Sequence, residues 1–157
     1  LGIISVHPRP CSVLMDKKRS KLPSVNQFVA LLRGQRIDRK NPRQQIKVLN
    51  NIASEVKDGR IYLVFPQGGY AKNQKNNVGD FKYGCFTSAY KAKCPVVPVA
   101  IVDSYKPFGE NSLKHVTTKV IFLSPLYYED YCGLKSPQLC GIVRNLIEDE
   151  IKKHISD

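Results

Sequence analysis

The feature that most limits the fold of this chain is a regular change of hydrophobic period along its 157 residues. In some segments apolar residues recur every three or four positions, as on one face of a helix. In others they run continuously, as in a buried strand. Because helical and strand segments follow one another in turn, the pattern predicts an α/β fold with a mostly parallel central sheet flanked by helices.

The helical segments have recognisable boundaries. Asn41-Pro42 is typical of a helix start, since Asn caps the first turn and Pro is tolerated there. Gly34 is expected to cap the end of the preceding helix, and Gly59 marks the end of the next one. The expected helices cover residues 25–32, 41–58, 82–93 and 136–151.

Three short apolar runs, at 61–65, 96–102 and 119–123, are the expected strands. The run Ile61 to Phe65 is continuous, which predicts a strand buried on both faces of a parallel sheet. Pro66 and two glycines end it. Ligands of α/β proteins bind at the loops beyond the carboxyl ends of the strands, so we expect the site there.

Length and composition predict one domain over residues 1–157. The 42% apolar and 24% charged residues argue against disorder, and no run approaches the roughly 18 apolar residues of a membrane-spanning helix. Since Leu1 opens an apolar stretch and is not Met, we expect the domain to lack its N-terminal part.

The cysteines and histidines predict no metal site, because they are widely spaced and no CxxC pair occurs. An odd number of scattered cysteines indicates reduced thiols in the cytosol. Cys85 and Cys94 lie in apolar segments and are interpreted as core residues. The other three cysteines are Cys11, Cys132 and Cys140, and the three histidines are His7, His115 and His154.

A formal charge of +12 is concentrated near the N-terminus, where residues 1–60 hold 13 basic and 4 acidic side chains. This field predicts an anionic partner, either phosphate groups or an anionic membrane surface. The alternative is a solvated face that only keeps the chain soluble. Nucleic acid is disfavoured, because arginines and aromatic residues are not interleaved. The cluster comprises Lys17, Lys18, Arg19, Lys21, Arg33, Arg36, Arg39, Lys40 and Arg43.

Two loops have the residue types of an anion site. Phe65 to Tyr70 follows a strand and contains paired glycines, whose backbone can approach a ligand closely; the alternative is a tight turn at positive φ. Arg39 precedes a helix start, where its guanidinium fork suits phosphate. The alternative for Arg39 is a surface ion pair with Asp38 or another acid.

Taken together, these blocks resemble the glycerolipid acyltransferases, and more narrowly the PlsC-like 1-acylglycerol-3-phosphate acyltransferase family. The resemblance covers about residues 13–108, and the segment from Met15 to Pro23 is similar to the stretch between the family's first two motifs. The matching blocks are Ile37-Asp38-Arg39, Tyr62 to Gly68, Phe81 to Gly84, and Pro95 to Ile101.

The resemblance implies an O-acyltransferase that moves a fatty acyl chain from an acyl thioester, of coenzyme A or acyl carrier protein, to a lysophosphatidic-acid-like acceptor. It would act in phospholipid synthesis without a tightly bound cofactor, as a cytoplasmic protein peripheral at the inner face of the membrane. Its implied substrate-binding residues are Ile37, Asp38 and Arg39 for the phosphate, Phe65, Pro66, Gln67 and Gly68 for the acceptor, and Val97 and Pro98 for the pocket wall.

Two departures from the family pattern stand out. The catalytic block, a His followed five positions later by Asp, is absent: His7 is followed by Ser12 and His115 by Val120. Truncation is the favoured explanation, and a catalytically inactive phospholipid-binding module of the same fold is the alternative.

The second departure lies in the block that begins at Tyr62 and in the two residues after it, where the family has Glu, Thr and Arg and this chain has Gln67, Gly69 and Tyr70. Gln keeps an acceptor oxygen without the charge. The acceptor is therefore expected to differ from lysophosphatidic acid, or the activity to be weaker. Lys72, Arg36 and Lys40 are the candidates to replace the lost arginine.

Overall fold

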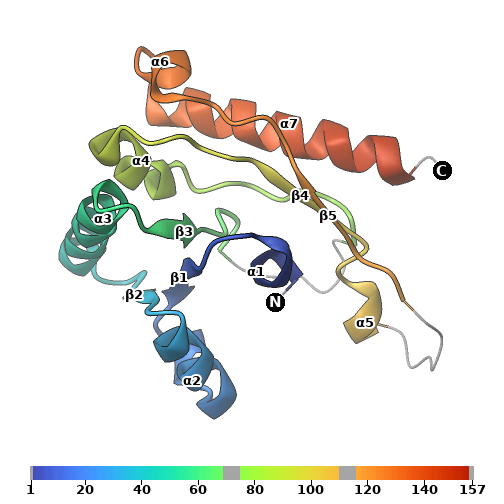
Figure 1. Cartoon of the computed structure of the whole chain (residues 1–157), viewed down its shortest axis with the longest axis horizontal. Helices are drawn as coiled ribbons and strands as arrows, with labels where there is room; N and C mark the ends of the chain where they lie inside the picture. The colour runs from blue at the N-terminus through green and yellow to red at the C-terminus, as the bar shows by residue number, and fades with distance from the viewer. Residues whose placement is uncertain (1, 69–74, 110–115, 156–157) are drawn as a thin grey trace.

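Three parallel strands form the sheet that the alternating periods predict. β1 (Cys11–Asp16) lies between β2 (Gln35–Ile37) and β3 (Ile61–Leu63), and it pairs in parallel with both (Figure 1). The computed structural model describes residues 2–68, 75–109 and 116–155. It confirms the α/β class and the parallel central sheet.

Helices make both crossover connections of this sheet. After α1 (Gly2–Val6) and β1, the chain passes through a 3-10 turn, η1 (Arg19–Lys21), and α2 (Pro23–Leu31) before it enters β2. α3 (Pro42–Lys57) then leads from β2 to β3 and packs against both strands. Each crossover brings the chain back to the end of the sheet at which the preceding strand began, so all three strands run in the same direction.

The predicted start of α3 is confirmed, and the predicted cap of α2 is wrong in detail. Asn41 accepts a hydrogen bond from the Gln44 backbone N–H at 3.1 Å. At the end of α2 the left-handed residue is Arg33, with φ 49°, and Gly34 follows it. A Cβ on Gly34 would lie 2.7 Å from the Val13 carbonyl oxygen, so this glycine is needed for close packing on β1.

The second half of the chain forms a strand pair covered by a long helix. β4 (Val99–Val102) and β5 (Lys119–Phe122) pair antiparallel, and α7 (Ser136–Ile155) packs against β4 (Figure 1). The alternation of periods did not predict an antiparallel pair. The only regular helix described between the two strands is the four-residue α5 (Lys106–Gly109), so the chain turns back instead of crossing over.

Several predicted boundaries shift for identifiable reasons. The strand expected at 96–102 begins at Val99, since Pro98 has no N–H to donate to a ladder; Val96 instead forms a single bridge with Leu126. The helix expected at 82–93 is a 3-10 turn, η2 (Tyr83–Phe86), followed by α4 (Thr87–Ala92).

The expected burial of the 61–65 run is wrong. β3 is an edge strand, its residues are half-buried, and Phe65 beyond it is 47% exposed. The buried strand is β1, which the apolar periods did not reveal: its Val13 is only 2% exposed. A central strand is covered on both sides, whereas an edge strand keeps contact with solvent.

The largest buried cluster lies between α7, η2 and the short helix α6 (Tyr128–Tyr131). Tyr131 is at its centre, and its hydroxyl donates to the Cys94 carbonyl at 2.6 Å. Tyr90 and Tyr128 pack edge-on against the Tyr131 ring. The buried members are Phe86, Tyr131, Leu139, Cys140 and Val143.

All five cysteines are free thiols. Burial raises the pKa of Cys85 to about 12, with the neighbouring Cys140 adding to the shift, as suits a core residue. Within the described ranges, no three His, Cys, Asp or Glu side chains gather closely enough to hold a metal ion. Likewise, none of the helices that the structure describes has the length and apolar character needed to cross a membrane.

Candidate functional site

Three segments far apart in the sequence meet at the carboxyl edge of the parallel sheet. Asp16 is the last residue of β1, Arg39 follows the end of β2 by two positions, and Gly68 lies in the loop after β3. Because parallel strands end at the same edge, their following loops converge there. The structure thus brings two of the predicted binding residues, Arg39 and Gly68, into contact with each other, and Arg39 also pairs with Asp16.

Arg39 is the centre of this junction. Its Nε lies 2.8 Å from Asp16 Oδ2, and its Nη2 donates a hydrogen bond to the Gly68 carbonyl. Its own carbonyl accepts from Gln45 Nε2 at 3.0 Å, which ties the residue to the first turn of α3. The Arg39 side chain is 39% exposed, so the guanidinium is held in place and remains open to a ligand.

The expected alternative, an ion pair of Arg39 with an acid, is present, and the acid is Asp16 rather than Asp38. The second carboxylate oxygen of Asp16 accepts from the backbone N–H groups of Lys18, at 2.9 Å, and Arg19, at 3.2 Å. Asp16 is only 14% exposed. A carboxylate fixed by three donors is a rigid support for the guanidinium.

Gly68 has a conformation and a position that other residues do not fit. Its φ is +66°, and a Cβ there would lie 2.8 Å from Nη2 of Arg39. The paired glycines were predicted to give either a tight turn or a close approach to a ligand; at Gly68 the turn and a close approach to Arg39 coincide. Gly69, Tyr70 and Lys72 lie outside the described residues.

Asp38 faces the same junction as an ionised group. Its carboxylate accepts from the Lys40 backbone N–H at 3.0 Å and pairs with Lys17 Nζ at 3.5 Å. These contacts, with the Lys40 N–H as the largest cause, hold the pKa of Asp38 below its ordinary value. The Asp38 N–H donates to Gln44 Oε1 at 2.8 Å, which anchors the loop on α3.

A cavity of about 160 Å³ opens beside Arg39. Four of its lining side chains are basic and two are acidic, so the charge of the lining is positive. Its size suits a phosphate headgroup and not an acyl chain. The lining residues are Asp16, Lys17, Lys18, Ile37, Asp38, Arg39 and Lys40.

The other predicted binding residues are placed differently. The Pro66 carbonyl accepts from the Lys82 N–H at 3.0 Å, and Gln67 is half-buried in the same turn. Val97 and Pro98 belong to the approach to β4, in the antiparallel pair, where the Pro98 carbonyl accepts from the Leu123 N–H. Pro98 is buried and Val97 is 44% exposed.

His7 lies towards the amino-terminal end of β1, whereas Arg39 lies at the carboxyl ends of the strands. It precedes the first residue of β1, whose six residues rise about 16 Å before Asp16. Its Nδ1 interacts with the backbone of Arg9, and its ring packs near Phe122 at a centroid distance of 5.9 Å. This position separates His7 from the cavity beside Arg39.

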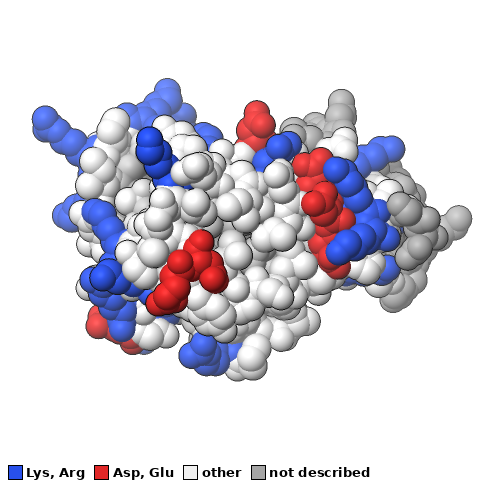
Figure 2. All heavy atoms as spheres, turned by 90° about the horizontal axis from the view of Figure 1, so that it is seen from above, with Lys and Arg blue, Asp and Glu red and all other residues white. Residues whose placement is uncertain are grey.

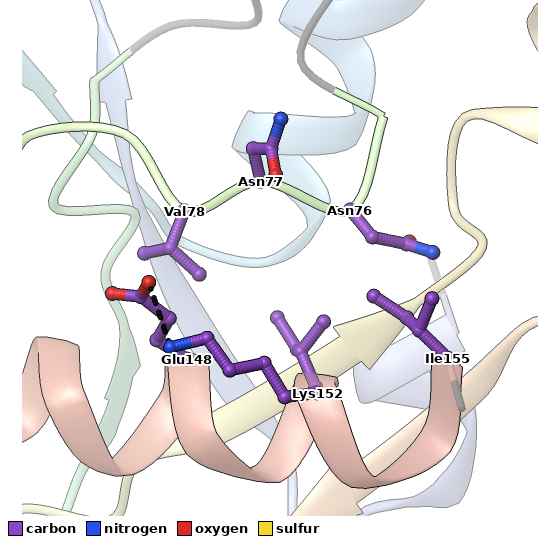
Figure 3. Close-up of a pocket in the computed structure, with 7 residues that line it drawn as sticks. Asn76, Asn77, Val78, Glu148, Lys152 and Ile155 are labelled. Atoms are coloured by element: carbon purple, nitrogen blue, oxygen red, sulfur yellow. Dashed lines mark ion pairs between the residues drawn. The ribbon is translucent and has the colours of Figure 1, made fainter.

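A second cavity, of about 270 Å³, lies between the 76–78 segment and the last two turns of α7 (Figure 3). Glu148 and Lys152 form an ion pair of 3.2 Å along its floor. Asn76, on the other wall, donates to Asp103 Oδ1 at 3.0 Å and is thereby tied to the end of β4. Neither the apolar periods nor the motifs predicted this cavity, and none of the predicted binding residues lines it.

The sequence reasoning missed Asp16 as the partner of Arg39. The signal was present in the segment Cys11 to Asp16, which ends in an acid followed by two lysines, but without knowledge of β1 nothing placed that acid at the site. Lys17 and Lys18 were predicted only as members of a basic cluster. In the structure both line the cavity.

The chain is similar to known acyltransferases. A sequence model of the family described as Acyltransferase matches residues 1–102. The chloroplastic 1-acyl-sn-glycerol-3-phosphate acyltransferase BAT2 of Brassica napus is 35% identical over 118 residues, which make up 73% of this chain and 32% of that protein. The 1-acyl-sn-glycerol-3-phosphate acyltransferase of Saccharomyces cerevisiae is 31% identical over 156 residues, or 94% of this chain and 50% of that protein.

The fold is also that of a solved structure. The crystal structure of the 1-acyl-sn-glycerophosphate acyltransferase PlsC from Thermotoga maritima aligns with 94% of this chain and 58% of its own, with a TM-score of 0.71 and 18% sequence identity. The chain spans about a third to a half of the length of the two curated relatives described above.

Proposed function

Since the chain belongs to the Acyltransferase family, we propose that it provides the acceptor-binding part of a 1-acyl-sn-glycerol-3-phosphate O-acyltransferase of phospholipid synthesis. In that reaction the free hydroxyl of the acceptor attacks the carbonyl carbon of an acyl thioester. A C–O bond forms, the C–S bond breaks, and the hydroxyl proton ends on the released thiol. The two relatives with 35% and 31% identity bear the name of this activity.

The observation that carries the proposal is the cavity beside Arg39. A phosphomonoester is compact and doubly charged, and it is best bound by charge-assisted hydrogen bonds from a fixed arginine and nearby lysines. Asp16 fixes the guanidinium, while Lys17, Lys18 and Lys40 add positive charge around it. Arg39 therefore binds the acceptor phosphate in this proposal.

The remaining predicted roles belong to the loop after β3 and to the 97–98 segment. Phe65, Pro66 and Gln67 lead from β3 to Gly68, which contacts Arg39, so the acceptor hydroxyl end lies along this loop. The role of Val97 and Pro98 as a pocket wall stays a prediction, since neither residue lines the cavity beside Arg39. Replacement of the family's Glu by Gln67 leaves an oxygen that accepts a hydrogen bond from the acceptor.

The acyl donor is a thioester of coenzyme A or of acyl carrier protein. Both carriers are strongly anionic, and the excess of basic residues in the first 60 positions attracts either of them. The same charge favours a peripheral position on the cytoplasmic face of an anionic membrane, where a lysophospholipid acceptor resides.

A second candidate is a phospholipid-binding module of the same fold that performs no chemistry. The observation in its favour is that no histidine of this sequence is followed five positions later by Asp. A general base that takes the hydroxyl proton is needed for the transfer. Both candidates share phosphate binding at Arg39, and they differ only in thioester consumption.

Titration of the whole chain with glycerol 3-phosphate tests the shared step. Arg39→Ala should lower the affinity about 10- to 100-fold, because hydrogen bonds to a charged group contribute about 1.5–3 kcal/mol. Arg60→Ala is the matched control: it removes the same charge from a residue that precedes β3 at the other edge of the sheet and pairs with Glu55. Equal losses in both variants would mean that binding depends on overall charge and not on this cavity.

Acceptor-dependent release of free thiol from an acyl thioester then separates the two candidates. Release that depends on Arg39 supports the acyltransferase. Tight glycerol phosphate binding without any thiol release, under conditions where a related enzyme is active, supports the binding module.

A further inference from the structure

We propose that α2, together with Leu22 at its N-terminus, is the element that docks on an anionic phospholipid surface and brings the Arg39 cavity to the level of the headgroups. This inference rests on the proposed function, because it assigns the surface from which the acceptor enters. The basic composition predicts only that some part of the chain attracts an anionic surface, whereas the proposal names the helix and the side chains that make the contact.

α2 is the longest of the described helices that lack a charged side chain. None of its nine residues, Pro23 to Leu31, is charged, although the chain as a whole is 24% charged. Its inner face is anchored by Val29, which is fully buried and lies close to Gly34 beneath β1. Its outer face, formed by Pro23, Gln27, Ala30 and Leu31, is exposed.

Two large apolar side chains project from the ends of this helix. Leu31 is 81% exposed and Leu22 is 60% exposed, and these are the two highest values among the exposed large hydrophobic residues in the described part of the chain. Isolated exposed leucines are ordinary on protein surfaces. Leu31 at the end of α2 and Leu22 just before it lie close in sequence to basic residues, and apolar side chains beside basic ones are a feature of segments that lie in the membrane interface.

Basic residues flank α2 at both ends. On one side the η1 turn and the residues just before it carry Lys17, Lys18, Arg19 and Lys21, and on the other side Arg33 is exposed. η1 packs directly on α2. Exposed leucines framed by lysines and arginines complement a surface with an apolar interior and anionic headgroups.

The docking helix is continuous with the phosphate cavity. Lys17 and Lys18 line that cavity and also begin the turn that leads into α2. From β2, Arg36 donates to the Asn26 side chain at 2.8 Å, so the helix and the strand that precedes Arg39 are held together. Insertion of Leu22 and Leu31 below the headgroups therefore leaves the cavity close to the phosphates.

The exposed apolar side chains of α7 form a less suitable docking surface for an anionic membrane. Ile142 and Leu146 of α7 are 40% and 39% exposed. In Figure 1 α7 crosses the top of the molecule, whereas α2 lies at the bottom. The face seen from above has a broad uncharged area bordered by groups of both signs (Figure 2). Acidic groups beside it oppose contact with anionic headgroups.

Co-sedimentation of the whole chain with vesicles tests the proposal, using phosphatidylcholine alone and an equimolar mixture with phosphatidylglycerol. The chain should bind the mixed vesicles, and binding should weaken at high salt. Leu22→Glu combined with Leu31→Glu should lower the partition constant at least about 10-fold. Ile142→Glu combined with Leu146→Glu, the matched control on α7, should leave it within about 2-fold. Circular dichroism would confirm that all variants fold.

Three outcomes would overturn the inference. The α7 pair could abolish binding while the α2 pair does not, which would place the membrane on the other face. Both pairs could bind like the parent chain, which would leave charge alone as the attraction. The α2 pair could change the oligomeric state in light scattering without changing vesicle binding, which would make α2 a contact between copies.

Glycerol 3-phosphate titration keeps this test separate from that of the proposed function. The α2 variants should bind glycerol 3-phosphate in solution like the parent chain, since neither leucine lines the cavity. Loss of vesicle binding with normal glycerol phosphate binding supports the docking helix. Normal vesicle binding in the Arg39→Ala variant, with loss of glycerol phosphate binding, would leave the two functions independent.

Discussion

The two halves of this molecule use different interactions. The N-terminal half holds the parallel sheet and carries the excess of positive charge, with 13 basic and 4 acidic residues in the first 60. In the C-terminal half, residues 101–157 hold 7 basic and 8 acidic side chains and include α7, which packs into both hydrophobic clusters. The N-terminal half therefore attracts anions to its loops, and the C-terminal half buries most of the apolar side chains of the two clusters.

This contrast follows from the role of each half: one carries the proposed phosphate site and the other carries most of the buried aromatic residues. A phosphate site needs unbalanced charge, which lowers stability through self-repulsion. Buried aromatic residues offset that cost when they are packed edge-on and their hydroxyls have partners, as around Tyr131. The comparison therefore predicts that stability and ligand binding are affected by substitutions in different halves.

The largest expected effect is on stability, from Tyr131→Ala. Removal of a ring that is 1% exposed, with its two edge-on contacts, should lower the free energy of unfolding by about 3–5 kcal/mol. Tyr83→Ala, at a side chain 58% exposed, should change it by at most about 0.5 kcal/mol. Urea denaturation followed by circular dichroism measures both. Similar losses would show that Tyr131 is not central to the core.

A smaller effect, on binding, is expected from Gly68→Ala. The φ of +66° strains any other residue, and the new Cβ would displace the Arg39 guanidinium. Glycerol 3-phosphate affinity should fall about 10-fold. Gly84→Ala is the control, because a Cβ there meets nothing within 4 Å. Unchanged affinity in Gly68→Ala would mean that its contact with Arg39 does not position the guanidinium.

The smallest effect is a pH dependence that both halves share. Burial, aided by the Glu55 carboxylate, raises the pKa of Tyr62 to about 12, and burial raises that of Tyr131 above its ordinary value. Because these pKa values are higher in the folded state than in the unfolded state, the two neutral hydroxyls stabilise the fold. This stabilisation is complete below about pH 10 and is lost as the pH rises towards 12.

Denaturation at a series of alkaline pH values measures this loss, which we expect to be about 1 kcal/mol for Tyr62. Tyr62→Phe and Tyr131→Phe show which half responds. If Tyr62→Phe leaves the alkaline loss unchanged, its hydrogen bond of 2.6 Å to Glu55 does not control the titration.

Much of the N-terminal half could be predicted from local sequence. The start of α3 at Asn41-Pro42 depends on capping within one turn, and the structure confirms it. The location of a site at the carboxyl ends of strands follows from the parallel topology, and Arg39 and Gly68 do meet there. The roles of the predicted binding residues remain predictions that the experiments above address.

Features that depend on neighbours in space were not predicted. β3 was expected to be buried because its residues are apolar, but its place at the edge of the sheet exposes it. The antiparallel pairing of β4 and β5 depends on how the connection between them folds back. The second cavity exists only because α7 packs beside the 76–78 segment.

By itself, the sequence determined the α/β class, the family, the starts of α3 and α7 and the basic N-terminal half, because these depend on period, capping, motif order and composition. The tertiary structure alone decided that Asp16 supports Arg39, that Gly68 must lack a side chain, and that Leu31 of the charge-free helix α2 and Leu22 just before it are exposed. The physical reason is that contacts between distant segments depend on strand order and packing, which no local pattern records.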